Sequence, residues 1–179
     1  KFIIDRGLTI SCVSVSNNFG DSRERGRRRE VEKVKKWTEI AYKFGSPVLR
    51  VFAGWPGLTR RDENRQKRVD KEKLWPKMIE CMKESVKYAE DIGVVLGVEN
   101  HNAKGFVATT DEIFRIKKEV DSDWLMLVLD TGGNLPQPDY AMIEKTIELA
   151  PHVHAKFLEI DEKGQDRVLD YKKIFGILN

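Results

Sequence analysis

The chain contains little cysteine and no long apolar run. Only Cys12 and Cys81 occur among its 179 residues, without a CxxC pair. We expect one in a strand and one in a helix, as buried thiols of a reducing cytoplasm. No 18 consecutive residues are apolar, so neither a transmembrane helix nor a membrane partner is expected. The opening KFIIDRGL has no signal-peptide h-region and no initiator Met, which suggests a cytoplasmic protein with a cut N-terminus.

Two glycine motifs of nucleotide-binding folds are also absent. No GxGxxG follows the first expected strand, and GxxxxGK[ST] occurs nowhere. The dinucleotide-binding and P-loop interpretations therefore lose their main support. What is present, 40% hydrophobic and 34% charged residues, is typical of a folded protein, and the length suits a single domain over 1–179.

Basic residues cluster, although the net charge is only +3. The stretches RERGRRRE (23–30) and RRDENRQKR (60–68) read either as solvated loops or helix starts, or as surfaces that attract an anionic substrate. No aromatic residues are interleaved with them to stack on bases, so no nucleic-acid partner is expected.

Short apolar segments alternate with segments of helical periodicity. The expected strands are 8–16, 47–54, 94–100, 124–130 and 152–160. The expected helices are 30–45, 74–93 with Gly93 as its C-cap, 111–120 capped by Thr110, 139–150 opened by Pro138, and 171–179 capped by Asp170. Five βα units with short apolar strands indicate an α/β fold with a buried parallel sheet, either doubly wound or a (β/α)8 barrel.

Polar residues stand where these strands end. Glu99, Asp130 and His154 lie on three successive strands, 31 and 24 residues apart, which is about one βα repeat each. Reactive groups of parallel α/β folds gather at this edge, and a buried carboxylate is costly unless paired or metal-bound. Two carboxylates and an imidazole suit Mn²⁺, Mg²⁺, Co²⁺ or Zn²⁺. Each residue alone could instead belong to an ion pair or the core.

Further polar residues accompany them, each with two interpretations. Lys156 shares a strand face with His152 and His154, and either binds a substrate oxygen or pairs with a carboxylate. Arg50 binds substrate or forms an ion pair inside the barrel. His101 either binds substrate or forms hydrogen bonds within its loop. Trp55 is either a wall of the substrate pocket or an aromatic residue that covers the surface. His152 reads as structural.

The segments VLRVFAG, VLGVENH, LVLDTGGNLP and HVHAKFLEID resemble the sugar phosphate isomerase/epimerase group of xylose isomerase-like TIM barrels. The same superfamily contains endonuclease IV-type DNA repair enzymes. The resemblance implies a (β/α)8 TIM barrel that is incomplete here, with about strands two to six present and the first and last two absent. It also implies a metal held by Glu99, Asp130 and His154, while the fourth ligand, a Glu on the eighth strand, has no counterpart.

The resemblance implies an activity as well. A divalent metal would polarise a sugar carbonyl, and Glu99 would act as both ligand and general acid/base through an enediolate. Many relatives have His or Asn three residues after the Asp; Gly133 stands there, followed by Asn134. We expect a sugar isomerase or epimerase. Alternatives are a metal-dependent endonuclease, a keto-polyol dehydratase and a non-catalytic barrel fragment. Open sheet edges suggest a homo-oligomer.

Overall fold

The computed structural model describes residues 3–57, 70–102, 104–133 and 139–179. Its strands are β1 (Cys12–Ser14), β2 (Val48–Val51), β3 (Val95–Glu99), β4 (Leu125–Asp130) and β5 (His152–His154). Its α-helices are α1 (Glu24–Lys43), α2 (Lys71–Ile92), α3 (Thr110–Val120), α4 (Tyr140–Thr146) and α5 (Tyr171–Leu178), and short 3₁₀ helices are η1 (Ile4–Arg6) and η2 (Ile147–Leu149). The expected alternation of strand and helix is confirmed.

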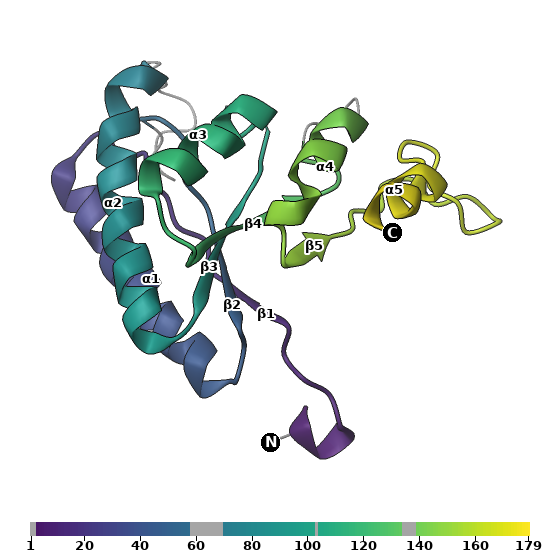
Figure 1. Cartoon of the computed structure of the whole chain (residues 1–179), viewed down its shortest axis with the longest axis horizontal. Coiled ribbons are helices and arrows are strands. Elements are labelled where there is room, and N and C mark those ends of the chain that lie inside the picture. The colour runs from purple at the N-terminus through teal and green to yellow at the C-terminus, as the bar shows by residue number, and fades with distance from the viewer. Residues whose placement is uncertain (1–2, 58–69, 103, 134–138) are drawn as a thin grey trace.

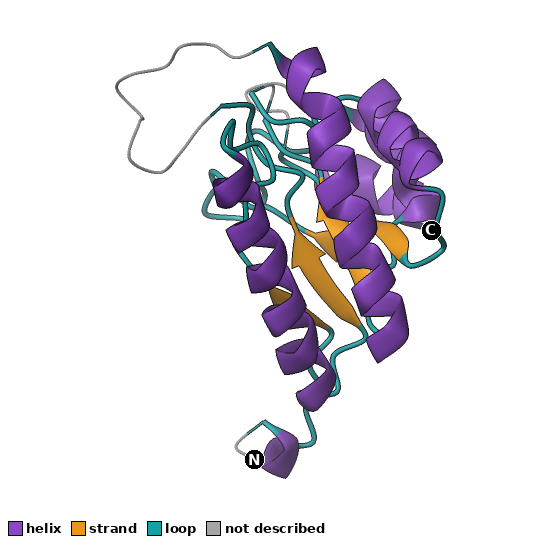
Figure 2. Cartoon of the chain, turned by 90° about the vertical axis from the view of Figure 1, so that its left-hand side faces the viewer, coloured by secondary structure: helices purple, strands orange, loops and turns teal. Residues whose placement is uncertain are grey.

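The strands form one parallel sheet in the order β1-β2-β3-β4-β5, which is also their order in the chain (Figure 1). A doubly wound sheet reverses direction at a switch point, whereas a barrel adds each strand beside the last. The helices accordingly stand on one side of the strands (Figure 2). The sheet is half of a (β/α)8 barrel, as the resemblance implied.

Strand periodicity divides the sheet into two faces. Apolar residues of the face toward the helices are buried, with at most 3% of their surface exposed: Leu49, Val51, Leu96, Val98, Leu127 and Leu129. Helix residues at three- and four-residue spacing pack on them, among them Val34, Met78, Met82, Ile113 and Ile116. The opposite, concave face carries the polar residues of the strands, because side chains alternate along each strand.

Helix ends follow local capping chemistry. The Asp70 side chain accepts from the Glu72 N–H at the start of α2, and Gly93 ends that helix with φ 86°, as expected of a left-handed C-cap. Thr109, not Thr110, caps α3, because Glu112 three residues later reaches back to the Thr109 N–H and closes a capping box.

Several expected boundaries were wrong. The helix expected at 30–45 begins at Glu24, so most of the basic stretch 23–30 is helical. The helix expected at 139–150 begins after the cap Asp139 and changes to 3₁₀ geometry at Ile147, while Pro138 lies outside the described residues. The strands expected at 8–16 and 152–160 have three residues each. Both are edge strands with one neighbour in the sheet, so no second ladder prolongs them.

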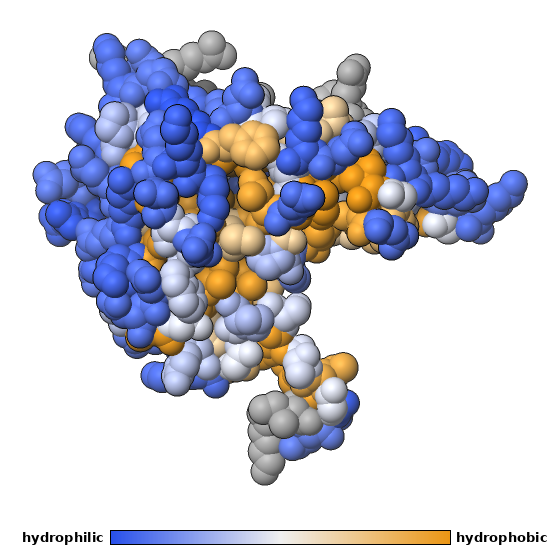
Figure 3. Space-filling view, viewed as in Figure 1, coloured by the Kyte–Doolittle hydropathy of each residue, from blue (hydrophilic) through white to orange (hydrophobic). Residues whose placement is uncertain are grey.

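Large apolar side chains remain exposed near both edges of the sheet. Leu8 precedes β1. The segment after β5 contains three more, Phe157, Leu158 and Ile160, and α5 contains Phe175. In Figure 3, hydrophilic residues cover the left-hand part of the molecule, whereas hydrophobic residues are visible between it and the hydrophilic tip on the right. Within the described residues, no helix is long and apolar enough to cross a membrane.

Candidate functional site

The polar residues of the concave face gather at the carboxyl ends of the middle strands. The parallel register places Arg50 beside Gly97, Glu99 beside Val128, and Asp130 beside His154. Residues in register share a face, and so do residues two apart on one strand. The following therefore line this face: Arg50, Gly97, Glu99, Val128, Asp130, His152 and His154.

Glu99 is buried, with 6% of its surface exposed, and has two partners. Its Oε1 contacts Nδ1 of His154, and its Oε2 lies 3.4 Å from Nε of Arg50. That Nε is buried and has no hydrogen bond, while Nη1 of Arg50 donates to the Val15 carbonyl at 3.2 Å. Arg50 thus forms the ion pair that was one of its two interpretations. A second partner offsets the cost of burying the carboxylate.

Asp130 is as buried as Glu99 but has different partners. Its Oδ2 accepts from Nζ of Lys156 at 2.7 Å, and its Oδ1 accepts from the Gly132 N–H at 2.8 Å. Lys156 therefore takes the carboxylate-pairing interpretation, with 43% of its side chain exposed at the rim. The hydroxyl of Tyr171 donates to the Lys156 carbonyl at 2.6 Å, which holds the segment after β5 against the strand ends.

The three predicted metal ligands are only partly assembled. Glu99 and His154 meet, whereas Asp130 binds Lys156; within the described part of the chain, no three His, Cys, Asp or Glu side chains form a group that could hold an ion. The donor set of two carboxylates and one imidazole fits a divalent cation chemically, and the contact between Glu99 and His154 brings two of its members together. The donor types of these three residues therefore suit a divalent metal, while Lys156 is paired with the third proposed ligand, Asp130.

Aromatic rings form a wall beside Glu99. The Trp55 and His101 rings are 4.9 Å apart between centroids, and both are near Phe52, at 5.1 and 5.3 Å. The Arg50 guanidinium lies over the Phe52 ring at 4.3 Å. Glu99, His101, Trp55 and Phe52 line one small pocket together. Phe52 was missed in the sequence, although its position two residues after Arg50 signals the same face.

The two other histidines lose basicity through burial. Burial lowers the pKa of His101, and that of His152 as well. The Asn102 N–H donates to Nδ1 of His101 at 2.8 Å, so this nitrogen is the acceptor and Nε2 carries the proton of the neutral ring. His101 thus makes a loop hydrogen bond and still offers an N–H donor. The His152 ring stands edge-on to that of His154 at 5.1 Å, consistent with a structural role.

Two buried asparagines near the site, Asn17 and Asn100, were not predicted to have a role, because the sequence shows only that each follows a strand. Both backbone polar groups of Asp130 bind the side chain of Asn100, and those of Phe52 bind Asn17. Gly133 packs against the Asn100 amide, whereas Asn134, the alternative noted in the sequence, lies outside the described residues. Side chain to backbone pairing of this kind depends on tertiary contacts that one sequence does not reveal.

The first basic stretch makes structural contacts. Arg23 pairs with Asp21 at 2.9 Å, Nη1 of Arg27 donates to the Asp21 carbonyl at 2.9 Å, and Arg28 pairs with Glu84 at 2.8 Å. These contacts join the start of α1 to the loop before it and to α2. The second stretch, 60–68, lies outside the described residues.

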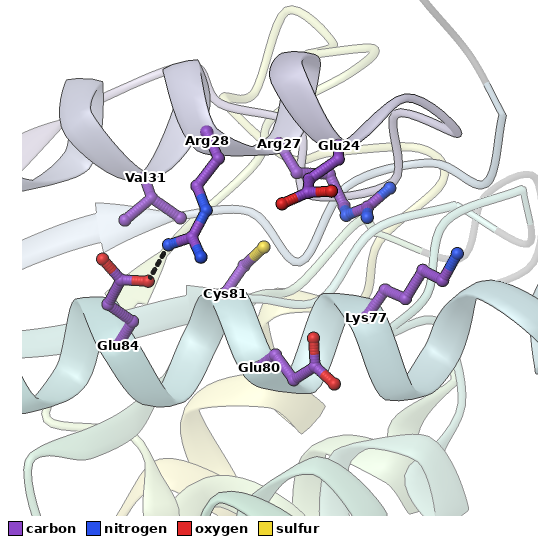
Figure 4. Close-up of a pocket in the computed structure, with 8 residues that line it drawn as sticks. All are labelled: Glu24, Arg27, Arg28, Val31, Lys77, Glu80, Cys81 and Glu84. Carbon is purple, nitrogen blue, oxygen red and sulfur yellow. Dashed lines mark hydrogen bonds and ion pairs between the residues drawn. The ribbon is translucent and has the colours of Figure 1, made fainter.

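Another hollow lies between α1 and α2, on the side of the helices away from the sheet's concave face (Figure 4). Three basic and three acidic side chains line it around Val31 and Cys81, so its formal charges cancel: Arg27, Arg28, Lys77, Glu24, Glu80 and Glu84. Burial raises the pKa of the Cys81 thiol to about 11. A protonated thiol is a poor nucleophile. Cys81 in α2 is buried as expected, whereas Cys12 in β1, which was also expected to be buried, is only half-buried.

Comparison with solved structures finds the same fold in longer proteins. The 3-keto-D-glucoside 4-epimerase YcjR from E. coli superposes with a TM-score of 0.78 at 19% identity, over 98% of this chain and 69% of that one. The D-psicose 3-epimerase from Clostridium cellulolyticum H10, solved with D-tagatose, gives 0.78 at 20%, over 98% and 61%. A xylose isomerase-like TIM barrel protein from Mycobacterium smegmatis, solved with magnesium, gives 0.67 at 22%, over 90% and 56%.

These structures share the fold, and the chain spans between 56% and 69% of their lengths. None of the curated proteins compared with the chain matches it. The family model of the xylose isomerase-like TIM barrel matches all of residues 1–179. The half-barrel topology and the motifs at its strand ends agree with that match, and the chain belongs to the xylose isomerase-like TIM barrel family.

Proposed function

We propose that the chain belongs to a divalent-metal-dependent sugar epimerase or isomerase. One observation carries the proposal: Glu99, His154 and Asp130 end neighbouring strands on one concave face, and an aromatic pocket adjoins Glu99. Two of the similar structures are sugar epimerases and a third was solved with magnesium. Acidic and imidazole donors beside aromatic walls suit a polar, hydroxyl-rich substrate and a hard cation.

Glu99, Asp130 and His154 would hold the cation, which when bound supplies Lewis-acid polarisation of a carbonyl and its neighbouring hydroxyl. Mn²⁺, Mg²⁺, Co²⁺ and Zn²⁺ all suit this donor set. Glu99 has the further role of moving a proton on the carbon next to the carbonyl. His154 contacts Oε1 and the Arg50 guanidinium lies beside Oε2, and these two contacts fix the direction of the carboxylate. A base held in one orientation is effective because no entropy has to be lost to orient it in the transition state.

The surrounding residues would bind the sugar. Trp55 and His101 form a wall with Phe52, against which the apolar face of a sugar ring can pack while water is excluded. The Nε2–H of the neutral His101 ring can donate to a hydroxyl, because Nδ1 accepts from the Asn102 N–H. Lys156, half-exposed beside Asp130, can donate to a substrate oxygen at the rim. Arg50 contributes through Glu99 or through a direct contact with substrate.

The activity test follows proton transfer directly. The purified protein is incubated in D₂O with Mn²⁺ and a panel of ketohexoses, ketopentoses and 3-keto-glucosides, and NMR detects a new epimer or isomer with deuterium on the reacting carbon. We expect product with at least one sugar, its loss on chelation with EDTA, and a fall of about 10²- to 10⁴-fold in rate for Glu99→Gln.

The matched control is Glu144→Gln, because Glu144 is an exposed carboxylate on α4 and loses the same charge. It should retain the wild-type rate. Product formation that survives EDTA, or equal rates for the two variants, would refute the assignment of metal and base.

The sheet edges support a homo-oligomer within this proposal. β1 and β5 each have one neighbour in the sheet, and exposed apolar residues such as Leu8 and Phe157 lie beside them. Unpaired edges favour association with another chain. Light scattering after gel filtration should give a mass above that of one chain, and a stable, monodisperse monomer would contradict the expectation.

A further inference from the structure

Two buried asparagines use the same arrangement at different places in the sheet. Asn17 follows β1, and its amide donates to the Phe52 carbonyl and accepts from the Phe52 N–H, both at 2.8 Å. Asn100 follows β3, and its amide donates to the Asp130 carbonyl at 3.0 Å and accepts from the Asp130 N–H at 2.8 Å. Their exposed fractions are 2% and 0%. Each side chain binds both backbone groups of one residue at the end of the next strand: Phe52 directly after β2, and Asp130 as the last residue of β4.

The Asn100 amide lies where the regular ladder between β3 and β4 stops. The last register pair of these strands is Glu99 with Val128, two residues before Asp130. On the other side, Asp130 is in register with His154, and the Thr131 N–H donates to the His154 carbonyl at 3.1 Å. Asn100 therefore binds the N–H and the carbonyl of Asp130 on the β3 side, while β5 binds the next residue, Thr131. The chain around Asp130 is held from both neighbours.

Gly133 makes room for this amide. A Cβ at position 133 would lie 2.6 Å from the side-chain Nδ2 of Asn100 and 3.2 Å from the backbone carbonyl oxygen of the same residue. Real Cβ atoms essentially never approach a heavy atom as closely as 2.6 Å, so any larger residue must displace the Asn100 side chain or the loop. A side chain at position 133 would therefore disturb the same pairing of Asn100 with Asp130, although Gly133 is on a different chain segment from Asn100.

We propose that Asn100 is a positioning residue, which fixes the backbone of Asp130 so that its carboxylate is directed at the metal site. The inference rests on the proposed function, because it concerns one of the proposed ligands. Groups that orient metal ligands typically contribute 10- to 100-fold to metal affinity, since they remove the freedom that a ligand would otherwise lose on binding. Asn17 has the same chemistry and burial but holds Phe52, which cannot ligate a metal.

Calorimetric titration with Mn²⁺ compares the wild type with Asn100→Ala, Gly133→Ala and Asn17→Ala, at a temperature where circular dichroism shows each to be folded. We expect the first two to raise the Mn²⁺ dissociation constant by about 10- to 100-fold, and Asn17→Ala to leave it unchanged while lowering the melting temperature. Gly133→Ala retains Asn100 and so carries the test if Asn100→Ala does not fold.

Two results would overturn the inference. Wild-type affinity in both Asn100→Ala and Gly133→Ala would show that Asp130 needs no such support. Equal weakening by Asn17→Ala would show that the effect is a general loss of stability. If the wild type binds no Mn²⁺, the proposed metal site and this inference are both refuted. If the wild type binds Mn²⁺ and both variants bind it equally well, only this inference is refuted.

Discussion

Oε1 of Glu99 contacts Nδ1 of His154, although the residues are 55 positions apart and lie on strands that β4 separates. The contact joins the third and fifth strands across the concave face of the sheet. Carboxylates and imidazoles are both donors that hold divalent cations in proteins. The contact therefore brings two of the three proposed ligands to one place on this face.

Lys156→Met should have opposite effects on stability and on metal affinity. The Lys156 ammonium is the charged partner of the buried Asp130 Oδ2. Its removal should lower the free energy of unfolding of the metal-free protein by about 1–3 kcal/mol, because a buried carboxylate loses its donor. It should also strengthen Mn²⁺ binding, because Nζ no longer occupies an oxygen that the cation needs.

Urea unfolding without metal and calorimetry with Mn²⁺ measure the two effects. Lys163→Met is the control, since Lys163 is exposed in the following loop and the variant has the same net charge. Weaker Mn²⁺ binding by Lys156→Met than by the control would mean that Lys156 supports the site rather than competing for Asp130.

Gly97→Ala should destabilise the sheet close to Glu99. A Cβ there would meet Cγ2 of Val128 at 2.4 Å and Cγ1 of Val48 at 3.1 Å. Overpacking of this kind typically costs about 1–3 kcal/mol. Gly176→Ala is the opposite case, because its Cβ position in α5 has no heavy atom within 4 Å among the described residues outside the local helix backbone. Replacing a helical glycine by alanine stabilises by about 0.5–1 kcal/mol. Urea denaturation should show the two changes with opposite signs.

Thr109→Ala and Thr110→Ala separate the cap of α3 from its first helical residue. The Glu112 N–H donates to the Thr109 hydroxyl at 3.3 Å, so loss of that hydroxyl should cost about 0.5–2 kcal/mol. Thr110→Ala removes no capping contact and should change the free energy of unfolding less. A larger loss for Thr110→Ala in thermal unfolding would contradict the capping box.

The order of elements could be predicted because it depends on local patterns. Apolar runs ending in Glu99 and Asp130 marked central strands, and Gly93 marked the end of α2 correctly. Edge strands were overestimated, because residues after His154 alternate like a strand but have no second neighbour to pair with. Thr109 was missed as a cap, since the adjacent Thr110 matches the same local rule and only the Glu112 spacing separates them.

The sequence could place candidate site residues on one face, but it could not predict their contacts. Strand alternation placed Glu99 and His154 on one face, and the structure brings them together. The sequence could not decide between substrate and ion-pair roles for Arg50 and Lys156, because that choice depends on distances across strands. It gave no reason to select Asn100, whose role arises from two backbone groups of Asp130 rather than from its own chemistry.

Metal content tests the central claim most directly. Wild type, Glu99→Gln and the exposed control Glu144→Gln are loaded with Mn²⁺, separated from free metal by gel filtration, and analysed for the element. We predict stoichiometric Mn²⁺ in the wild type and in the control, and its loss from Glu99→Gln, because the amide removes the charged ligand. Metal-free wild-type protein, or equal Mn²⁺ in Glu99→Gln, would contradict the account.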